Sequence, residues 1–279
     1  MLSSPILLDY QSSTPCHPEV VDAMKPYWGR IFGNPSNKSN LAGISSRAAL
    51  EVSREKIIQK LNLKNKKIIF TSGATEANNL ALLGYARNFY KRTGSFGNIV
   101  TLKTEHHAVL EPIGQLEKEG FSFTQITPYE NGLIDKQMLL NAIKKDTFLV
   151  SIMLANNEIG VIQPLEDLAQ ICKSKKIIFH TDAAQCIGYI TPNSFCTLAN
   201  MITLSSHKMY GPKGVGLLII DKFLDIEPLF FGGGQEFGLR SGTIPLPLIV
   251  GFAKALELAV DNTQKNVSKL SLLRNKLLD

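Results

Sequence analysis

The sequence predicts an α/β protein built on a mainly parallel sheet with helices on both faces. Between residues 66 and 220, short apolar runs alternate with longer amphipathic stretches. The apolar runs are rich in Ile, Val, Leu and Phe, which is typical of strands that are buried on both sides. The stretches between them are long enough for crossover helices, and this alternation favours parallel pairing.

The alternation can be followed in order along the chain. Each expected strand is a run of β-branched, aliphatic or aromatic residues. These strands are 67–70, 98–102, 121–126, 148–154, 176–181, 201–205 and 214–220. Each expected helix repeats apolar residues at three- or four-residue spacing. These helices are 74–87, 107–119, 135–145 and 164–174.

The two ends of the chain differ from this repeating region. The first 60 residues carry the turn signals S-S-T-P (12–15) and G-N-P-S (33–36), and a helix is expected near 45–61. The last residues, 259–279, keep helical periodicity to the end of the sequence. No Gly or Pro closes that helix, so the sequence is expected to stop within an element.

Composition excludes a membrane protein and gives no support for a nucleic-acid partner. No apolar run reaches the length of a membrane span, and the N-terminus lacks the basic segment of a signal peptide, so we expect a cytoplasmic protein. The formal net charge is +6, but the lysines are scattered and do not form a stripe with aromatic residues. We therefore expect neither nucleic acid nor membrane among the partners.

Four cysteines, at positions 16, 172, 186 and 196, are too widely spaced for a metal site. None belongs to a C-x-x-C pair, so neither a zinc site nor a redox dithiol is predicted. We expect all four to be reduced thiols.

Polar residues follow the expected strands, at the edge where sheets of this type bind ligands. Gly73, Ala74 and Thr75 follow the strand 67–70 and begin a helix. The free N–H groups and the dipole of a helix N-terminus suit a phosphate, although the same residues are also suited simply to capping the helix.

Other side chains are expected at the same edge. His106, after 98–102, is suited to stacking on a planar ligand or transferring protons, or else to capping a helix. Asn157 follows the fourth strand, and Asp182 and Gln185 follow the fifth. A buried acid is costly unless it caps a turn or faces a cation.

Lys208 follows the strand 201–205, next to Ser206 and His207. A lone lysine is usually solvated, but an anion cradle, a lysine, an acid and a histidine together are what pyridoxal 5′-phosphate requires. The acid keeps the pyridine nitrogen protonated, and a desolvated lysine readily loses its proton, as a Schiff-base lysine must. The sequence therefore predicts a pyridoxal phosphate site with Lys208 as the attachment point.

Eight collinear runs that span nearly the whole chain resemble the cysteine desulfurases, in the class V aminotransferase group of fold-type I pyridoxal phosphate enzymes. The runs are L-D-Y-Q-S-S-T-P (8–15), G-N-P-S (33–36), F-T-S-G-A-T-E-A-N-N (70–79), T-E-H-H-A-V-L (104–110), N-N-E-I-G-V-I-Q-P (156–164), H-T-D-A-A-Q (180–185), S-S-H-K-M-Y-G-P-K-G (205–214) and G-G-G-Q-E-F-G-L-R-S-G-T (232–243).

The resemblance implies a role for each matching position. Lys208 would hold the cofactor covalently and then act as acid and base, while His106 would stack on the ring and transfer protons. Asp182 would pair with the pyridinium nitrogen. The other implied contacts are Ala74, Thr75, Ser206 and His207 to the phosphate, Gln185 and Asn157 to the ring oxygen or substrate, and Thr243 to the phosphate of the partner subunit's cofactor in a homodimer.

The resemblance also implies an activity and a domain organisation. The substrate would be L-cysteine, and its sulfur would pass as a persulfide to an acceptor or scaffold protein for iron–sulfur cluster or thio-cofactor assembly. The expected domains are an N-terminal segment of a small domain (1–15), the large cofactor-binding domain (16–260) and the start of a truncated small domain (261–279). The family's persulfide cysteine and an arginine for the substrate carboxylate would lie beyond residue 279.

Two departures from the family pattern concern substrate handling. Phe237 stands where the family commonly has an arginine, and S-N-K-S-N (36–40) lacks the usual histidine. Because the residues that would decide substrate choice are expected beyond position 279, two alternatives stay open: a selenocysteine lyase or other class V enzyme, and a non-catalytic truncated partner subunit.

Overall fold

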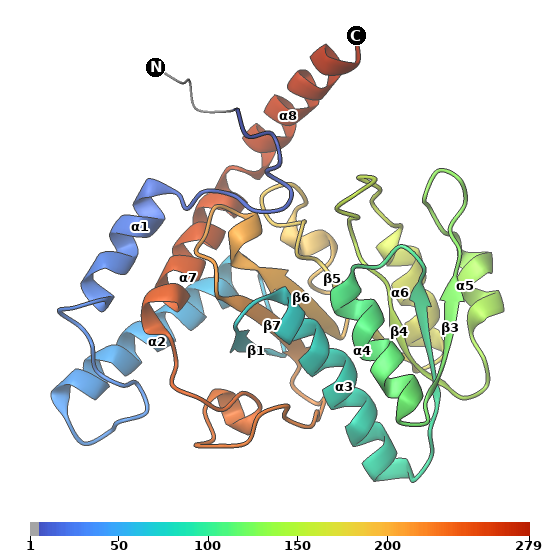
Figure 1. Cartoon of the computed structure of the whole chain (residues 1–279), viewed down its shortest axis with the longest axis horizontal. Helices are drawn as coiled ribbons and strands as arrows, with labels where there is room; N and C mark the ends of the chain where they lie inside the picture. The colour runs from blue at the N-terminus through green and yellow to red at the C-terminus, as the bar shows by residue number, and fades with distance from the viewer. Residues whose placement is uncertain (1–5) are drawn as a thin grey trace.

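A seven-stranded sheet forms the centre of the computed structural model, which describes residues 6–279 (Figure 1). The strand order is β1-β7-β6-β5-β4-β2-β3, and only β7 runs against its neighbours. The strands are β1 (Lys66–Thr71), β2 (Asn98–Leu102), β3 (Ser122–Ile126), β4 (Thr147–Ser151), β5 (Ile178–Asp182), β6 (Met201–Ser205) and β7 (Gly216–Asp221). The predicted α/β fold with a mainly parallel sheet is confirmed.

Helices cover both faces of this sheet (Figure 1). They are α1 (Pro18–Met24), α2 (Leu41–Lys60), α3 (Ala74–Thr93), α4 (His107–Lys118), α5 (Lys136–Ala142), α6 (Leu165–Ser174), α7 (Leu246–Asp261) and α8 (Thr263–Leu278). Among residues 6–279, no helix combines the length and the apolar character that crossing a membrane requires.

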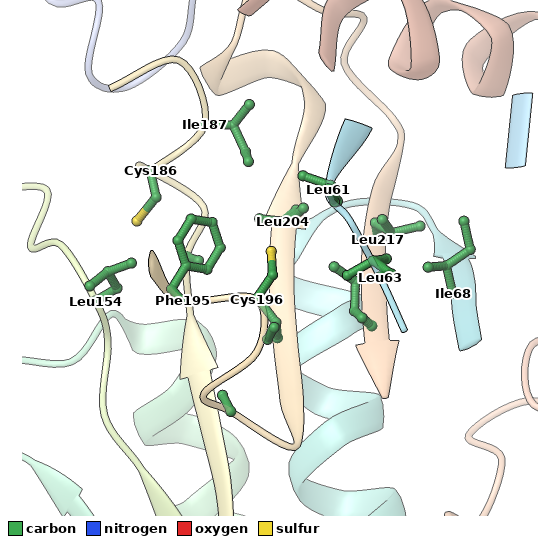
Figure 2. Close-up of a cluster of buried hydrophobic side chains, with 14 of the residues drawn as sticks. Leu61, Leu63, Ile68, Leu154, Cys186, Ile187, Phe195, Cys196, Leu204 and Leu217 are labelled. Atoms are coloured by element: carbon green, nitrogen blue, oxygen red, sulfur yellow. The ribbon is translucent and has the colours of Figure 1, made fainter. Parts of the chain in front are cut away.

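Alternation along the strands divides the core into two layers, because successive side chains point to opposite faces. Ile69 and Leu218 pack in one layer with α3 and α4. Ile68 and Leu217 pack in the other layer with α1, α2, α5, α6 and α7. Figure 2 shows part of that second layer, where Leu204 lies near Phe195 and Cys196, and Leu217 lies near Leu63.

Helices α1 and most of α7 were not predicted, and the structure also differs from the predicted elements in the following bounds. The strand expected over 148–154 ends at Ser151, although Ile152 N–H and Leu154 N–H still donate to carbonyls of β5. Helix α2 starts earlier than 45 because the Asn40 side chain caps it, accepting from Gly43 N–H at 2.7 Å. The helical C-terminus is divided at Asn262 into α7 and α8.

Candidate active site

A cavity of about 610 Å³ lies at the carboxyl ends of β4, β5 and β6, beside the N-terminus of α3. Eight of the predicted site residues line it. They are Ala74, Thr75, His106, Asn157, Asp182, Gln185, His207 and Lys208. The convergence that the strand ends predict is therefore present in the fold.

Lys208 reaches the cavity from a short helical turn, Ser206–Lys208, that directly follows β6. Its Nζ donates to the carbonyl oxygens of Gln11 at 2.6 Å and Ser12 at 3.0 Å. Burial lowers the pKa of Lys208, while the carboxylates of Asp182, Asp9 and Glu158 oppose that shift. The amine therefore loses its proton more readily than a solvated lysine, as a nucleophile requires.

Asp182 ends β5 and is 6% exposed. Its Oδ2 accepts from Asn78 Nδ2 at 2.7 Å, and its Oδ1 accepts from Ala184 N–H at 2.9 Å. Burial raises the pKa of this carboxyl, and these hydrogen bonds, with His106 and Lys208, oppose the shift. A fixed buried carboxyl of this kind is suited to pairing with a cation inside the cavity.

The first turn of α3 forms a cup at one end of the cavity. Among residues 6–279 no side chain caps this helix at Gly73, and the first N–H groups of a helix have no partner within it. The Glu76 carboxylate braces the turn by accepting from Ser72 N–H at 2.7 Å. Strand β7 packs closely against the backbone of the cup, because a Cβ added to Gly216 would lie only 2.5 Å from the Gly73 carbonyl carbon. The arrangement fits an anion.

Ser206 and Thr243 are the two predicted residues that the structure does not bring to this cavity. The Ser206 side chain is fully buried and packs against Gly211. A Cβ added to Gly211 would lie only 2.1 Å from Ser206 Oγ. Ser205 lines the cavity instead, because neighbouring residues at the end of β6 point in opposite directions. Its buried hydroxyl has no partner among residues 6–279. Thr243 is exposed outside the cavity.

The remaining predicted side chains are held by local hydrogen bonds. His106 caps α4, with Nδ1 accepting from Ala108 N–H at 3.0 Å, and it also lines the cavity. Gln185 Nε2 donates to the Gln11 carbonyl at 3.0 Å, and Asn157 Nδ2 donates to Glu158 Oε1 at 2.7 Å. Burial, with the nearby lysines, lowers the pKa of His207.

Three buried polar residues around the site were not predicted. Asn78 holds Asp182, Glu105 accepts from Met153 N–H at 2.6 Å, and His180 lies under the end of β5. Glu105 and His180 had a sequence signal, a polar residue near a predicted site residue in T-E-H-H and H-T-D, while Asn78 had none. The partners of all three lie far away in the sequence, so spacing along the chain could not identify these contacts.

The four cysteines, all among residues 6–279, do not line the cavity. Cys172, Cys186 and Cys196 are buried, and burial raises the pKa of each thiol. Burial also raises the pKa of Cys16, which is half-buried. A thiol with a raised pKa is a poor source of the thiolate that sulfur transfer requires.

Comparison with known proteins agrees with this geometry. The family described as aminotransferase class-V matches residues 6–277. The chain is 44% identical over 276 residues to a mitochondrial cysteine desulfurase of Arthroderma benhamiae and 43% identical over 280 residues to the cysteine desulfurase IscS of Rickettsia africae. These alignments cover 98% and 100% of the chain, but only 55% and 68% of the two relatives.

Solved structures of similar proteins share the fold. A NifS-like protein superposes with a TM-score of 0.91 at 40% identity, covering 97% of this chain and 73% of that one. SspA in complex with cysteine superposes with a TM-score of 0.84 at 40% identity, covering 91% and 72%.

Proposed function

Because the chain belongs to the aminotransferase class-V family, and its similarity to cysteine desulfurases extends over nearly its whole length, we propose that it binds pyridoxal 5′-phosphate and removes sulfur from L-cysteine. The observation that carries this proposal is the half-buried Lys208 amine in one cavity with the buried carboxyl of Asp182. A lowered lysine pKa next to a fixed acid is the pair that this cofactor requires.

The residues present fit the cofactor. The open N–H groups at Ala74 and Thr75 and the unpartnered hydroxyl of Ser205 suit its phosphate, with His207 beside them. Asp182 would hold the protonated ring nitrogen, and His106 would lie against the ring. Gln185 and Asn157 would contact the ring oxygen or the substrate. When bound, pyridoxal phosphate supplies an electron sink for negative charge on an attached amino acid.

The chain's own residues would manage the protons. Lys208 Nζ, released from the carbonyls of Gln11 and Ser12, would take the proton from the substrate Cα. A lysine with a lowered pKa is suited to this work near neutral pH. His106, which lines the same cavity, would exchange a second proton at the sulfur or the β-carbon.

The overall reaction breaks the bond between Cβ and sulfur in L-cysteine. An acceptor thiol forms a new S–S bond and becomes a persulfide, and the β-carbon gains a proton to give L-alanine. The raised pKa values and the positions of the four cysteines argue against each as the acceptor. We therefore propose that the persulfide forms on none of these four, in line with the expectation that the family's persulfide cysteine would lie beyond residue 279, and that its sulfur then passes to an acceptor or scaffold protein.

We further propose a homodimer, in which exposed Thr243 reaches the cofactor of the partner subunit. The cytoplasmic location stays a prediction, because the similar enzymes include both bacterial and mitochondrial proteins. The predicted domain boundaries, 1–15, 16–260 and 261–279, also stay predictions.

The test is to mix the purified protein, together with any residues that follow position 279, with pyridoxal phosphate, L-cysteine and a thiol reductant, and to measure alanine and sulfide. The proposal expects equal amounts of both, and none without the cofactor. Alanine from L-selenocysteine alone would favour a selenocysteine lyase. A protein that binds the cofactor but releases alanine from neither amino acid would be a non-catalytic partner, and the proposed activity would be wrong.

A further inference from the structure

Two turns at the cavity rim are tied together by hydrogen bonds in both directions. Glu105 Oε1 accepts from Met153 N–H at 2.6 Å, and Asn156 Nδ2 donates to the Thr104 carbonyl at 2.8 Å. Glu105 and Asn156 are 6% and 8% exposed. We call these two hydrogen bonds the rim brace.

The rim brace sets the spacing of two residues that line the cavity. Glu105 immediately precedes His106, and Asn156 immediately precedes Asn157. Asn156 also fixes its own turn, because its Oδ1 accepts from Glu158 N–H at 2.8 Å and Ile159 N–H at 2.9 Å. A shift in either turn would therefore move one cavity residue relative to the other.

Glu105 lies where a negative charge is costly. Its Oε2 is buried and has no hydrogen-bond partner within residues 6–279. Burial raises the pKa of Glu105 well above its ordinary value, and the Asp182 carboxylate on β5 raises it further, while Met153 N–H opposes the shift. Interactions with His106 and Lys208 lower the pKa of Asp182 and so oppose the effect of its burial. A buried pair of carboxyls under these conditions favours one proton on the less stabilised member.

We propose that Glu105 is a positioning residue that, as an uncharged carboxylic acid, sets the position of His106 relative to Asn157 across the cavity rim, leaving the negative charge of the buried pair to Asp182. The consequence for the cofactor rests on the proposed function. The rim brace and the proton on Glu105 are properties of the cofactor-free protein.

The protonation state is tested with Glu105→Gln, which keeps the shape and an acceptor oxygen but is neutral at every pH. Because the native pKa lies above the ordinary 4.5, the stability that Glu105 contributes is full below that pH and falls as the pH rises toward the native value. The melting temperature of the cofactor-free variant, relative to the parent, should rise by about 3–5 °C per pH unit above about pH 5, up to the native pKa of Glu105. A flat or falling difference would overturn the proposal.

The positioning role is tested by titrating pyridoxal phosphate and following the absorption of the bound cofactor. Glu105→Gln should keep the parent's dissociation constant within about twofold, because Met153 N–H keeps its acceptor. Glu105→Leu leaves that N–H unpaired and should weaken binding by about tenfold and shift the absorption band.

Glu111→Gln is the matched control, since this carboxylate lies on α4 with a side chain that is 79% exposed. It should behave as the parent in both tests. Parent-like binding by Glu105→Leu, or equal losses in the Gln and Leu variants, would refute the positioning role. If the parent itself binds no cofactor, the proposed function fails, but the melting measurements still report on Glu105.

Discussion

His180 shows how a single buried residue connects the strands that carry the site. It lies two residues before Asp182 on the same side of β5 and is fully buried. Its Nδ1 lies 2.8 Å from Ser151 Oγ on β4, and its Nε2 lies 3.2 Å from Thr203 Oγ1 on β6. Burial lowers the pKa of His180 to about 3, so the ring is neutral and joins three strands.

This low pKa predicts a loss of stability in acid. The stability that neutral His180 contributes is full above its ordinary pKa of 6.5 and is lost as the pH falls toward the native value of about 3. His180→Gln keeps a polar side chain that does not titrate. Its free energy of unfolding, relative to the parent, should improve by about 1.4 kcal/mol per pH unit below about pH 6.

Urea denaturation of the cofactor-free proteins at several pH values measures this difference. A difference that does not change with pH would show that His180 is charged in the native state or already neutral in the unfolded one.

The position of a site residue could be predicted from the sequence where it depends only on the end of the strand that the residue follows. Asp182 directly follows the apolar run 176–181, and Lys208 comes three residues after the run 201–205. Their position at the cavity could therefore be predicted without knowing the neighbouring strands. The predicted phosphate contact of Ser206 stays untested, but Ser205 faces the cavity, because the exact end of β6 decides which side chain points inward. Glu105 and His180 depend on contacts across strands, which spacing does not reveal.

At the level of elements, the phosphate cup depends on close packing between β7 and the start of α3. A Cβ on Gly216 would lie between 2.5 and 2.8 Å from three backbone atoms of Gly73. Backbone atoms cannot move aside as a flexible side chain can, so any larger residue at 216 must displace the cup.

Gly216→Ala should therefore weaken pyridoxal phosphate binding by about tenfold or more, because the N–H groups in the first turn of α3 would no longer point together at the phosphate. Gly114→Ala is the matched control, since it lies inside α4 with open space at its Cβ position. It should leave cofactor binding unchanged and raise stability by about 0.5–1 kcal/mol. Equilibrium titration and urea denaturation measure both effects. Unchanged binding in Gly216→Ala would contradict this description of the cup.

The elements themselves were mostly predictable, because buried strands and amphipathic helices differ clearly in period. Helix α7 was the main omission, since Pro247 and Gly251 look like breakers in its sequence. Pro247 lies in the first turn, where a missing N–H costs nothing. A Cβ on Gly251 would lie 2.6 Å from Met24 Sδ, so that glycine allows α1 and α7 to approach.

Across the whole molecule, the loop 230–243 is fixed to distant elements by two ion pairs. The buried Glu236 accepts from Arg54 of α2 at 2.7 Å and from Phe70 N–H of β1 at 2.9 Å. Arg240 donates to Glu76 of α3 at 2.9 Å. The loop that carries Thr243 is therefore joined to the same helix that forms the phosphate cup. The strand order that makes this possible could not be read from local patterns, because it is set by long-range packing.

The most direct test of the whole account is the visible absorption of the protein after mixing with pyridoxal phosphate. Two lysines, Lys208 and Lys213, line the cavity, so each is replaced in turn by alanine. The account predicts a visible band of lysine-bound cofactor in the parent and in Lys213→Ala, and no such band in Lys208→Ala. A band that persists in Lys208→Ala, or that never forms in the folded parent, would contradict it.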